Sequence, residues 1–326
     1  MFSKEIGINK NEDIESKKCS QCNSNAVTFI RYSGARLCRE HFSEYYETRV
    51  KKEFRKQIDL KKGDKIGVAV SGGKDSTLAL YIIHKILAPN RNVEVHAIQI
   101  DEGIESYRPP ALTILEENCK SWNVKYHLVS FKEEFGITMD DIAPKIKKGE
   151  LTACSFCGVF RRACMNKAAK EIGITALATG HNLDDLAQSI IMNITRGDVE
   201  RLARLGPHTS RVQPGLIPRL LPLRTIPEKE NYLYAILNGI KFHEAQCPYY
   251  EDALRNKYRA LIYDLERDTP GTRHSILQSY DAIRDALSLK YPPAVLNKCK
   301  QCSEPTPHVL CKKCELLEKA KSICKR

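Results

Sequence analysis

The chain has 326 residues, of which 42% are hydrophobic, so it is long enough to bury one large or two medium-sized cores. Its 52 lysines and arginines outnumber 40 acidic residues, and this net charge of +12 favours a polyanionic partner, with a merely lysine-rich surface as the alternative. No stretch approaches about 18 consecutive apolar residues, and the charged N-terminus lacks the apolar core of a secretory signal. We therefore expect a cytoplasmic protein without a membrane span.

The first cysteine group lies within residues 17–43, and an amphipathic, basic helix is predicted after it over 42–60. Because the chain has thirteen cysteines and no expected secretory signal, paired cysteines are interpreted as metal ligands before disulfides. A closed Cys₃His ligand set in this block predicts a structural zinc ion, and its members are Cys19, Cys22, Cys38 and His41.

Apolar runs then alternate with helix-like segments. Strands are predicted over 65–70, 93–101, 124–131 and 174–180. Helices are predicted over 76–87, 111–122, 157–173 and 183–197. This alternation predicts an α/β fold with a doubly wound parallel sheet. From about Pro227 the strands are expected to stop, and helices are predicted over 229–240, 251–266 and 273–289.

The last cysteine block follows a Pro-Pro pair and contains a closed Cys₄ set, which predicts a second structural zinc ion. Its ligands are Cys299, Cys302, Cys311 and Cys314. Lysines and arginines surround both terminal blocks, so we interpret them as RNA contacts. The alternative is that they only hold the termini in place or form a dimer contact.

The segment SGGKDS, residues 71–76, ends a predicted strand and opens a predicted helix, where phosphates are commonly bound. The backbone amides of Ser71, Gly72 and Gly73 can face an anion, because glycine permits close approach. Lys74 supplies positive charge, and Asp75 can position Mg²⁺ or cap the helix. The segment differs from the common P-loop, and a glycine-rich turn without a ligand is the alternative.

A second motif, TGHNLDD, lies at the end of a later strand and therefore at the same expected edge of the sheet. Gly180 is expected to let the strand end turn sharply, and His181 and Asn182 can reach a nucleotide. Asp184 and Asp185 open the next helix, where capping is expected to account for one of the two carboxylates.

Three central cysteines form a further group. Cys154 and Cys157 stand just before a predicted helix in LTACSFCGVFRR, and Cys247 lies in EAQCPYY. Three thiolates favour zinc or iron–sulfur, and a set of three leaves a position open, as a catalytic centre needs. Cys164 is expected to face the core, and His243 stays possible as a fourth ligand. A metal-free persulfide relay is the alternative.

SGGKDS looks like the PP-loop of the ATP pyrophosphatases. With C-x-x-C before GVFRR, TGHNLDD and CPY in that order, the chain resembles the 2-thiouridine synthetases of the TtcA/TtuA group over roughly residues 17–320. The terminal cysteine blocks favour the TtuA and cytosolic thiouridylase branch, because the cytidine-thiolating TtcA branch lacks them. The implied domains are an N-terminal zinc finger and linker helix (1–60), a PP-loop catalytic domain with a helical C-terminal part (61–292) and a C-terminal zinc finger (293–326).

The resemblance implies an oxygen-sensitive [4Fe-4S] cluster, or a [3Fe-4S] form of it, on Cys154, Cys157 and Cys247. It implies that Asp185 lies near the reacting centre, and Arg161 could neutralise phosphate charge, with an ordinary surface arginine as the alternative. Residues implied in binding ATP with Mg²⁺ are Ser71, Gly72, Gly73, Lys74, Asp75, Ser76, Gly180 and His181.

The reaction implied is ATP-dependent 2-thiolation of tRNA. ATP adenylates uridine O2, pyrophosphate leaves, and sulfur from sulfide or a ubiquitin-like sulfur carrier protein then displaces AMP at C2. In this group, thiolation of T-loop uridine 54 belongs mainly to heat-adapted organisms, whose proteins tend to contain less asparagine and cysteine. This chain is rich in both, so we expect modification of wobble uridine 34 instead. We also expect a homodimer. An ATP-dependent amidotransferase and a zinc RNA-binding module with a degenerate loop are the rival interpretations.

Overall fold

The computed structural model describes residues 17–147, 151–209, 213, 215–250 and 254–325. Its centre is a five-stranded sheet in the order β5-β4-β3-β6-β7, in which all neighbouring strands are parallel. The strands are β3 (Lys65–Ala69), β4 (Glu94–Asp101), β5 (Lys125–Ser130), β6 (Ala176–Thr179) and β7 (Arg219–Leu220). The predicted α/β fold is confirmed, and β7, which is too short to produce an apolar pattern, is an addition to it.

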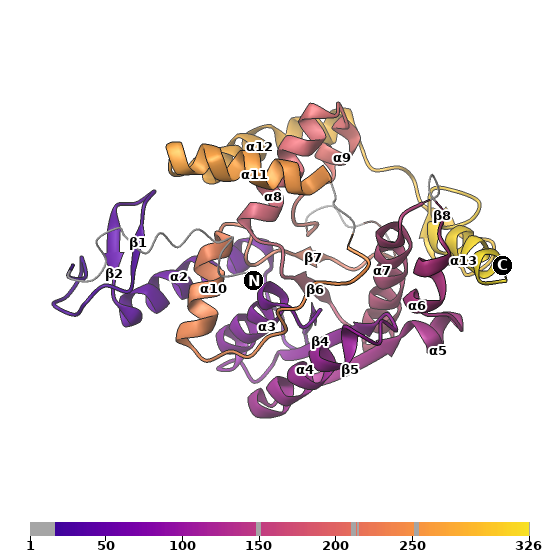
Figure 1. Cartoon of the computed structure of the whole chain (residues 1–326), viewed down its shortest axis with the longest axis horizontal. Helices are drawn as coiled ribbons and strands as arrows, with labels where there is room; N and C mark the ends of the chain where they lie inside the picture. Colours follow the sequence, from indigo (N-terminus) through magenta and orange to yellow (C-terminus); the bar gives the residue numbers. More distant parts are fainter. Residues whose placement is uncertain (1–16, 148–150, 210–212, 214, 251–253, 326) are drawn as a thin grey trace.

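The strand order places β3 beside β6, with β4 and β5 on one side and β7 on the other (Figure 1). From β3 the chain first adds β4 and β5 on one side, and it later returns to add β6 and β7 on the other side. The carboxyl ends of β3 and β6 therefore form the point where ligands of doubly wound sheets bind. The helices that follow these two strands are α3 (Lys74–Leu87) and α8 (Leu183–Thr195).

Several helices begin a few residues earlier than the sequence pattern predicts, and two of these starts have a clear physical reason. α4 (Arg108–Trp122) starts with a Pro-Pro pair, which fits the first turn because those amides have no helical partner. α7 (Ala153–Ile172) is capped by Thr152, whose hydroxyl accepts the N–H of Ser155. The two cysteines of the C-x-x-C motif therefore lie inside the helix, and the prediction that they precede it is wrong.

The helical part is confirmed, with α10 (Glu228–Leu237), α11 (Leu254–Asp268) and α12 (Thr272–Lys290). Residues 251–253 of the predicted helix over 251–266 lie outside the described residues. Shorter helices are α5 (Phe131–Phe135), α6 (Met139–Ile142), η1 (Ala143–Lys145) and α9 (Val199–Ala203). The expected end of strands at Pro227 is wrong, because the last block contains β8 (Asn297–Lys298) and β9 (Pro305–Thr306).

The terminal blocks lie on opposite sides of the molecule (Figure 1). The first contains the hairpin β1 (Thr28–Ile30) and β2 (Ala35–Leu37), followed by α2 (Arg39–Gln57). The buried aromatic side chains of α2 join the core cluster formed around β3 and α3. At the other side, α13 (Lys312–Cys324) places Leu316, Ala320 and Ile323 in a second core cluster with α7. Apolar packing thus continues across both expected domain boundaries.

None of the helices in the described ranges is both long and apolar enough to cross a bilayer.

Candidate functional site

The loop between β3 and α3 has a conformation that requires glycine. The φ of Gly72 is +85°, a region that side chains with a Cβ rarely adopt. A Cβ at Gly72 would also lie 2.8 Å from the Cβ of Ala111 on α4. The first glycine of SGGKDS therefore serves both the turn and the close packing of the loop against α4.

We expected three backbone amides of this loop to face an anion, but two of them already donate hydrogen bonds to serine hydroxyls inside the loop. The Ser71 N–H donates to Ser76 Oγ at 3.1 Å, and the Gly73 N–H donates to Ser71 Oγ at 3.4 Å. The Ser76 hydroxyl in turn donates to the Gly73 carbonyl at 3.0 Å. A phosphate entering this loop would have to replace the serine hydroxyls as acceptors, so the anion-binding role of these amides stays a prediction.

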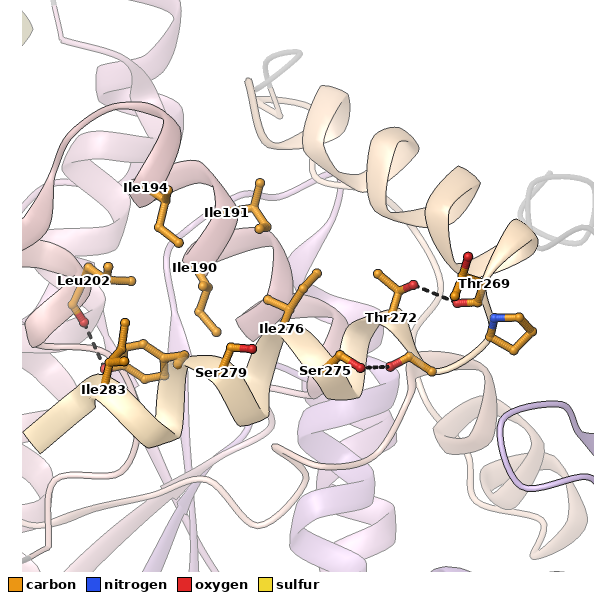
Figure 2. A pocket seen from close by; sticks show the side chains of 13 residues that line it. Ile190, Ile191, Ile194, Leu202, Thr269, Thr272, Ser275, Ile276, Ser279 and Ile283 are labelled. Carbon is orange, nitrogen blue, oxygen red and sulfur yellow. Dashed lines mark hydrogen bonds between the residues drawn. The ribbon is translucent and has the colours of Figure 1, made fainter.

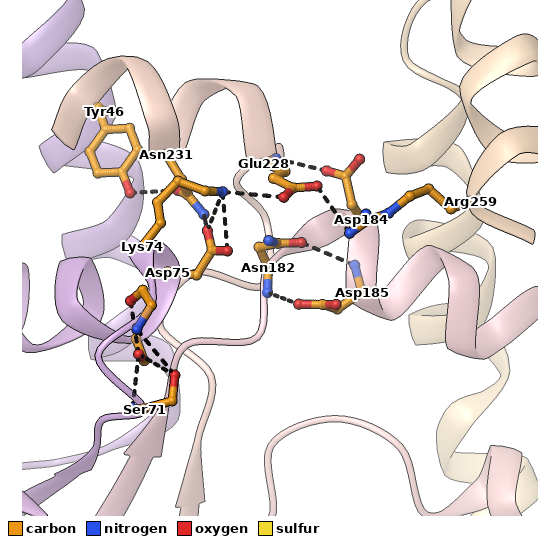
Figure 3. A network of polar contacts seen from close by, with 12 residues as sticks. Tyr46, Ser71, Lys74, Asp75, Asn182, Asp184, Asp185, Glu228, Asn231 and Arg259 are labelled. Atoms are coloured by element: carbon orange, nitrogen blue, oxygen red, sulfur yellow. Dashed lines mark hydrogen bonds and ion pairs between the residues drawn. The ribbon is translucent and has the colours of Figure 1, made fainter. Parts of the chain in front are cut away.

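Lys74 contacts the carboxylate of its neighbour Asp75 and that of Glu228, which lies far away in the sequence (Figure 3). Its Nζ lies 3.1 Å from Asp75 Oδ2 and 3.3 Å from Glu228 Oε1. Burial alone would lower the pKa of Lys74, but the charges of Asp75 and Glu228 outweigh burial and raise it. Asn231 Nδ2 donates to Asp75 Oδ1 at 2.8 Å. Lys74 thus stays charged and is held in one position.

Gly180 brings the second motif against the first. A Cβ at this position would lie 2.6 Å from the Ser76 nitrogen and 2.7 Å from the Asp75 carbonyl oxygen. The physical reason for glycine is therefore the close approach of two loops rather than the sharp turn that we expected. His181 is exposed beside this contact, and its Nδ1 lies 2.8 Å from Thr179 Oγ1.

The two aspartates of TGHNLDD have different partners (Figure 3). Asp185 forms a capping box with Asn182, in which each backbone N–H donates to the other side chain, at 3.0 and 3.2 Å. Asp184 accepts the Glu228 N–H at 2.7 Å and pairs with Arg273 at 3.1 Å. Helix capping therefore explains the presence of Asp185, which is the aspartate that we expected to be catalytic. Its catalytic role stays a prediction.

Asp184 makes the stability of the fold depend on pH. Burial raises the pKa of Asp184 to about 6, although Arg273 opposes the shift. The protonated carboxyl group thus favours the folded state, so its stabilising contribution is complete below about pH 4 and is lost as the pH rises through about 6. The difference between 3.8 and about 6 corresponds to about 3 kcal/mol. We expect the free energy of unfolding of the wild type, relative to Asp184→Asn, to fall by up to that amount between pH 4 and 7 in urea titrations; a difference that does not change with pH would contradict this.

The three central cysteines come together beside Tyr249. Cys154 is exposed and its Sγ donates to the Tyr249 carbonyl at 3.8 Å, while the Tyr249 N–H lies against the sulfur of Cys247. Cys157 and Cys247 are half-buried. Burial raises the pKa of Cys157 to about 12, and negative charge on Glu102, Cys247 or Cys154 acts in the same direction.

A cationic iron–sulfur cluster fits this set better than free thiolates do. Because burial raises the pKa of Cys157 to about 12, this side chain needs a nearby cation to be a thiolate at neutral pH, as iron would supply. Among the described residues, only the two terminal sets have all their ligand atoms within 4.8 Å of one another, as one metal ion requires. The sulfurs of Cys154, Cys157 and Cys247 do not all lie within that distance of one another. Ligands of a multi-iron cluster bind different iron atoms and are therefore farther apart than ligands of a single ion.

Cys164 is buried in the core on α7, as expected. His243 belongs to the PP-loop side instead, because its N–H donates to the Gly72 carbonyl at 2.9 Å and its ring packs against Tyr107 with centroids 5.2 Å apart.

A buried ion-pair chain links the PP-loop to the cysteine helix, and its first two members were not apparent in the sequence. Glu102 follows β4 and is 1% exposed; Arg108 opens α4 and is 3% exposed. The Arg108 guanidinium pairs with Glu102 and donates to the Ser71 carbonyl at 2.6 Å. Arg161 Nε on α7 lies 3.2 Å from Glu102 Oε1. Arg161 is thus an anchored side chain rather than an ordinary surface arginine.

The terminal cysteine sets have the dimensions of zinc sites. In the first set, the Sγ atoms of Cys19 and Cys38 both lie 3.4 Å from His41 Nδ1. In the second set, the sulfur–sulfur distances are 3.5 Å for Cys302–Cys311 and 3.9 Å for Cys299–Cys314. Zinc–sulfur bonds of about 2.3 Å in a tetrahedron separate the sulfurs by about 3.8 Å, so both sets fit a zinc ion.

A groove of about 490 Å³ lies elsewhere, between α8 and α12 (Figure 2). Its walls are largely apolar and include Ile190, Ile276 and Tyr280. It contains neither the PP-loop residues nor the central cysteines. We therefore take the edge formed by the PP-loop, TGHNLDD and the central cysteines as the candidate site.

Two family models and several known proteins match this chain. The PP-loop domain family matches residues 46–265, and the N-terminal LIM domain family of the 2-thiouridine synthetase TtuA matches residues 18–43. The tRNA 2-thiolation protein NcsA of Haloferax volcanii is 35% identical over 94% of this chain and 100% of its own length. The cytoplasmic tRNA 2-thiolation protein 1 of Drosophila melanogaster is 34% identical over 92% of this chain and 86% of its own.

A solved structure extends the similarity to three dimensions. The U34-tRNA thiolase NcsA from Methanococcus maripaludis, solved with its [4Fe-4S] cluster, has a TM-score of 0.80 and 31% identity. The match covers 93% of this chain and 96% of that protein. Sequence and fold agree along nearly the whole chain, which therefore belongs to the PP-loop family of tRNA 2-thiolation proteins.

Proposed function

We propose that the protein is an ATP-dependent tRNA-uridine 2-sulfurtransferase that acts in the cytoplasm on wobble uridine 34 and releases AMP and pyrophosphate. The main support is the ion-pair chain that joins the PP-loop to the cysteine helix through Arg108, Glu102 and Arg161. ATP chemistry and sulfur delivery need to occur at one uracil, and this chain of contacts holds both parts at one edge of the sheet. The thiolase from M. maripaludis, which is named for U34, supports the choice of position.

In this proposal, uracil O2 attacks the α-phosphorus of ATP and pyrophosphate leaves; sulfur then attacks C2 and AMP leaves. Lys74, held by Asp75 and Glu228, offsets the charge of the pyrophosphate, and Mg²⁺ binds beside Asp75. Gly180 keeps the two loops in contact, and His181 lies at their exposed rim. Asp185 keeps a second carboxylate oxygen outside its capping box, which is available to the reacting nucleotide.

Cys154, Cys157 and Cys247 would hold a [4Fe-4S] cluster, which supplies the site for the incoming sulfur when it is bound. The charge interactions among the three side chains and the burial of Cys157 support this assignment. Sulfide or a ubiquitin-like sulfur carrier protein would provide the sulfur. Mass spectrometry of tRNA fragments after the reaction distinguishes thiolation at uridine 34 from thiolation at uridine 54.

The PP-loop assignment is tested with Lys74→Gln. We expect this variant to lose ATP-dependent thiolation by at least about 100-fold, because the charge nearest to the pyrophosphate is removed while the helix is kept. Lys85→Gln is the matched control, since Lys85 lies on the same helix and pairs with Glu47 at the surface. ATP binding and thiolation are both measured. Wild-type thiolation by Lys74→Gln would exclude the assignment.

We also propose that each terminal set binds a structural zinc ion and that both blocks contact tRNA. Cys299→Ser combined with Cys302→Ser is expected to remove one zinc ion, destabilise the block that packs on α7 through α13 and weaken tRNA binding. The visible absorbance of anaerobically prepared protein should remain, because other cysteines hold the cluster. Metal analysis and absorbance spectra check this, and loss of the absorbance would show that the cysteines are assigned to the wrong groups.

The domain division at 1–60, 61–292 and 293–326 and a homodimeric state complete the proposal. Limited proteolysis and the mass from light scattering test these two points.

A further inference from the structure

Two arginines, one on the cysteine helix and one beside it, have no acidic partner among the described residues. Arg162 follows Arg161 on α7, and successive helical residues point about 100° apart, so Arg162 faces away from Glu102. A Cβ at Gly158 would lie 3.4 Å from Arg162 Nη1. The guanidinium of Arg162 therefore extends back along the helix, over the residue that follows Cys157.

Arg219 reaches the same stretch of α7 from β7. It is half-buried, and its guanidinium donates to Oδ1 of Asn166, which lies one turn after Arg162. Asn166 carries no charge, and within the described ranges neither Arg162 nor Arg219 forms an ion pair. The pKa of Arg219 is lowered to about 10, first by burial and then by the positive charge of Arg162. The pKa of Arg162 is also lowered, by burial and by the positive charge of Arg161. Burial is the main cause of both shifts, and a neighbouring guanidinium adds to each of them.

The three arginines that are buried in the described residues are all neutralised. Their ion pairs are Arg108–Glu102, Arg224–Asp281 and Arg273–Asp184. The half-buried guanidinium of Arg219 lacks a counter-charge, which is unfavourable, and an anion that binds there relieves that cost. Arg162 is exposed, so its guanidinium is accessible to such an anion. Two adjacent guanidinium groups match the oxygens of a phosphate.

We propose that Arg162 and Arg219 together bind one backbone phosphate of tRNA beside Cys157 and thereby hold the target nucleotide at the cysteine centre. The phosphates of ATP are the other source of this chemistry, but the PP-loop is linked to the Arg161 side of α7, from which Arg162 turns away. This inference rests on the proposed function, because it takes tRNA as the substrate.

The test measures binding of a tRNA transcript to anaerobically prepared holoprotein by fluorescence anisotropy over a series of salt concentrations. Arg162→Gln and Arg219→Gln should each weaken tRNA binding about tenfold and reduce the slope of log affinity against log salt by about 1. If both side chains hold one phosphate, the double variant should lose less than the product of the two single losses. ATP affinity should not change.

Lys120→Gln is the matched control, because it removes one positive charge from an exposed pair with Glu116 on α4. Arg162 is exposed, so its substitution is expected to leave the fold intact. The Arg162→Gln variant therefore tests phosphate binding even if Arg219→Gln fails to fold. Wild-type affinity and salt slope for Arg162→Gln would overturn the inference, as would weaker ATP binding with unchanged tRNA binding. The proposed function fails separately, if the wild-type protein binds tRNA but does not thiolate it.

Discussion

Replacement of Cys154, Cys157 or Cys247 by alanine, one at a time, will abolish both the iron–sulfur absorbance of anaerobically prepared protein and its tRNA thiolation. The charges of the three side chains interact with one another, and Cys154 and Cys247 both contact the backbone of Tyr249. Because a cluster with three protein ligands is lost when one ligand is removed, we expect thiolation to fall to background. Iron content, visible spectra and single-turnover thiolation are measured on the same preparations.

The control variants are Cys119→Ala, Cys164→Ala and Cys324→Ala. Cys119 and Cys164 are buried in apolar cores, where burial raises the pKa of each thiol to about 12, and Cys324 Sγ donates to the Asp141 carbonyl at 3.6 Å. These variants should keep iron and activity. Brief exposure to air should inactivate the wild type, because Cys154 is exposed to solvent. Robust turnover by iron-free protein supplied with a persulfide donor would overturn the cluster proposal and leave the ATP chemistry unaffected.

Removal of Glu102 alone will destabilise the protein by about 3–5 kcal/mol, because Arg108 is then left buried and unpaired. The double variant Glu102→Leu with Arg108→Met should recover most of this stability, since two apolar side chains replace both charges. We nevertheless expect its thiolation kcat to stay at least about 100-fold below that of the wild type, because the Ser71 carbonyl and Arg161 lose their common support. Urea unfolding and steady-state kinetics separate the two effects.

The ratio of effects on KM and kcat identifies the role of this ion pair. A positioning role predicts a large loss of kcat with a smaller change in KM for ATP, because Lys74 and the loop amides remain present. Arg108→Lys should not restore activity, since an ammonium group cannot pair with Glu102 and the Ser71 carbonyl in the same planar geometry. Full kcat in the stable double variant would show that the ion pair serves only the fold.

Local sequence patterns predict much of this architecture. The run at 65–69 is largely apolar, and the one at 94–101 has Val, Ala and Ile among polar residues. Both are followed by helical segments, so a parallel sheet is the arrangement they favour. Both terminal ligand sets were predictable because ligands with two residues between them lie on one turn. The PP-loop could be located because its glycines occur between a strand and a helix.

Long-range pairing explains what the sequence does not predict. Glu102 and Arg108 resemble ordinary charged residues until folding buries them against each other, and Glu228 and Asn231 reach the PP-loop from α10. The capping box at Asp185 looks the same in sequence as a catalytic carboxylate pair. β7 is too short to show alternation, although it delivers Arg219 to the cysteine helix.

The contacts of α2 have a consequence for the order in which the protein can fold as it is synthesised. Tyr46 donates to Asn231 Oδ1 at 2.6 Å across 185 residues of sequence, and Arg49 pairs with Glu230 across 181. At about 5–20 residues per second, the ribosome needs about 10–40 s to produce these partners after α2 emerges. During this interval the nascent N-terminal segment has the four side chains of its proposed zinc site but lacks the surface on which it will pack. We expect early metal capture to keep its thiols from oxidation and aggregation until α10 is made, so that zinc supply during translation limits the yield of folded protein.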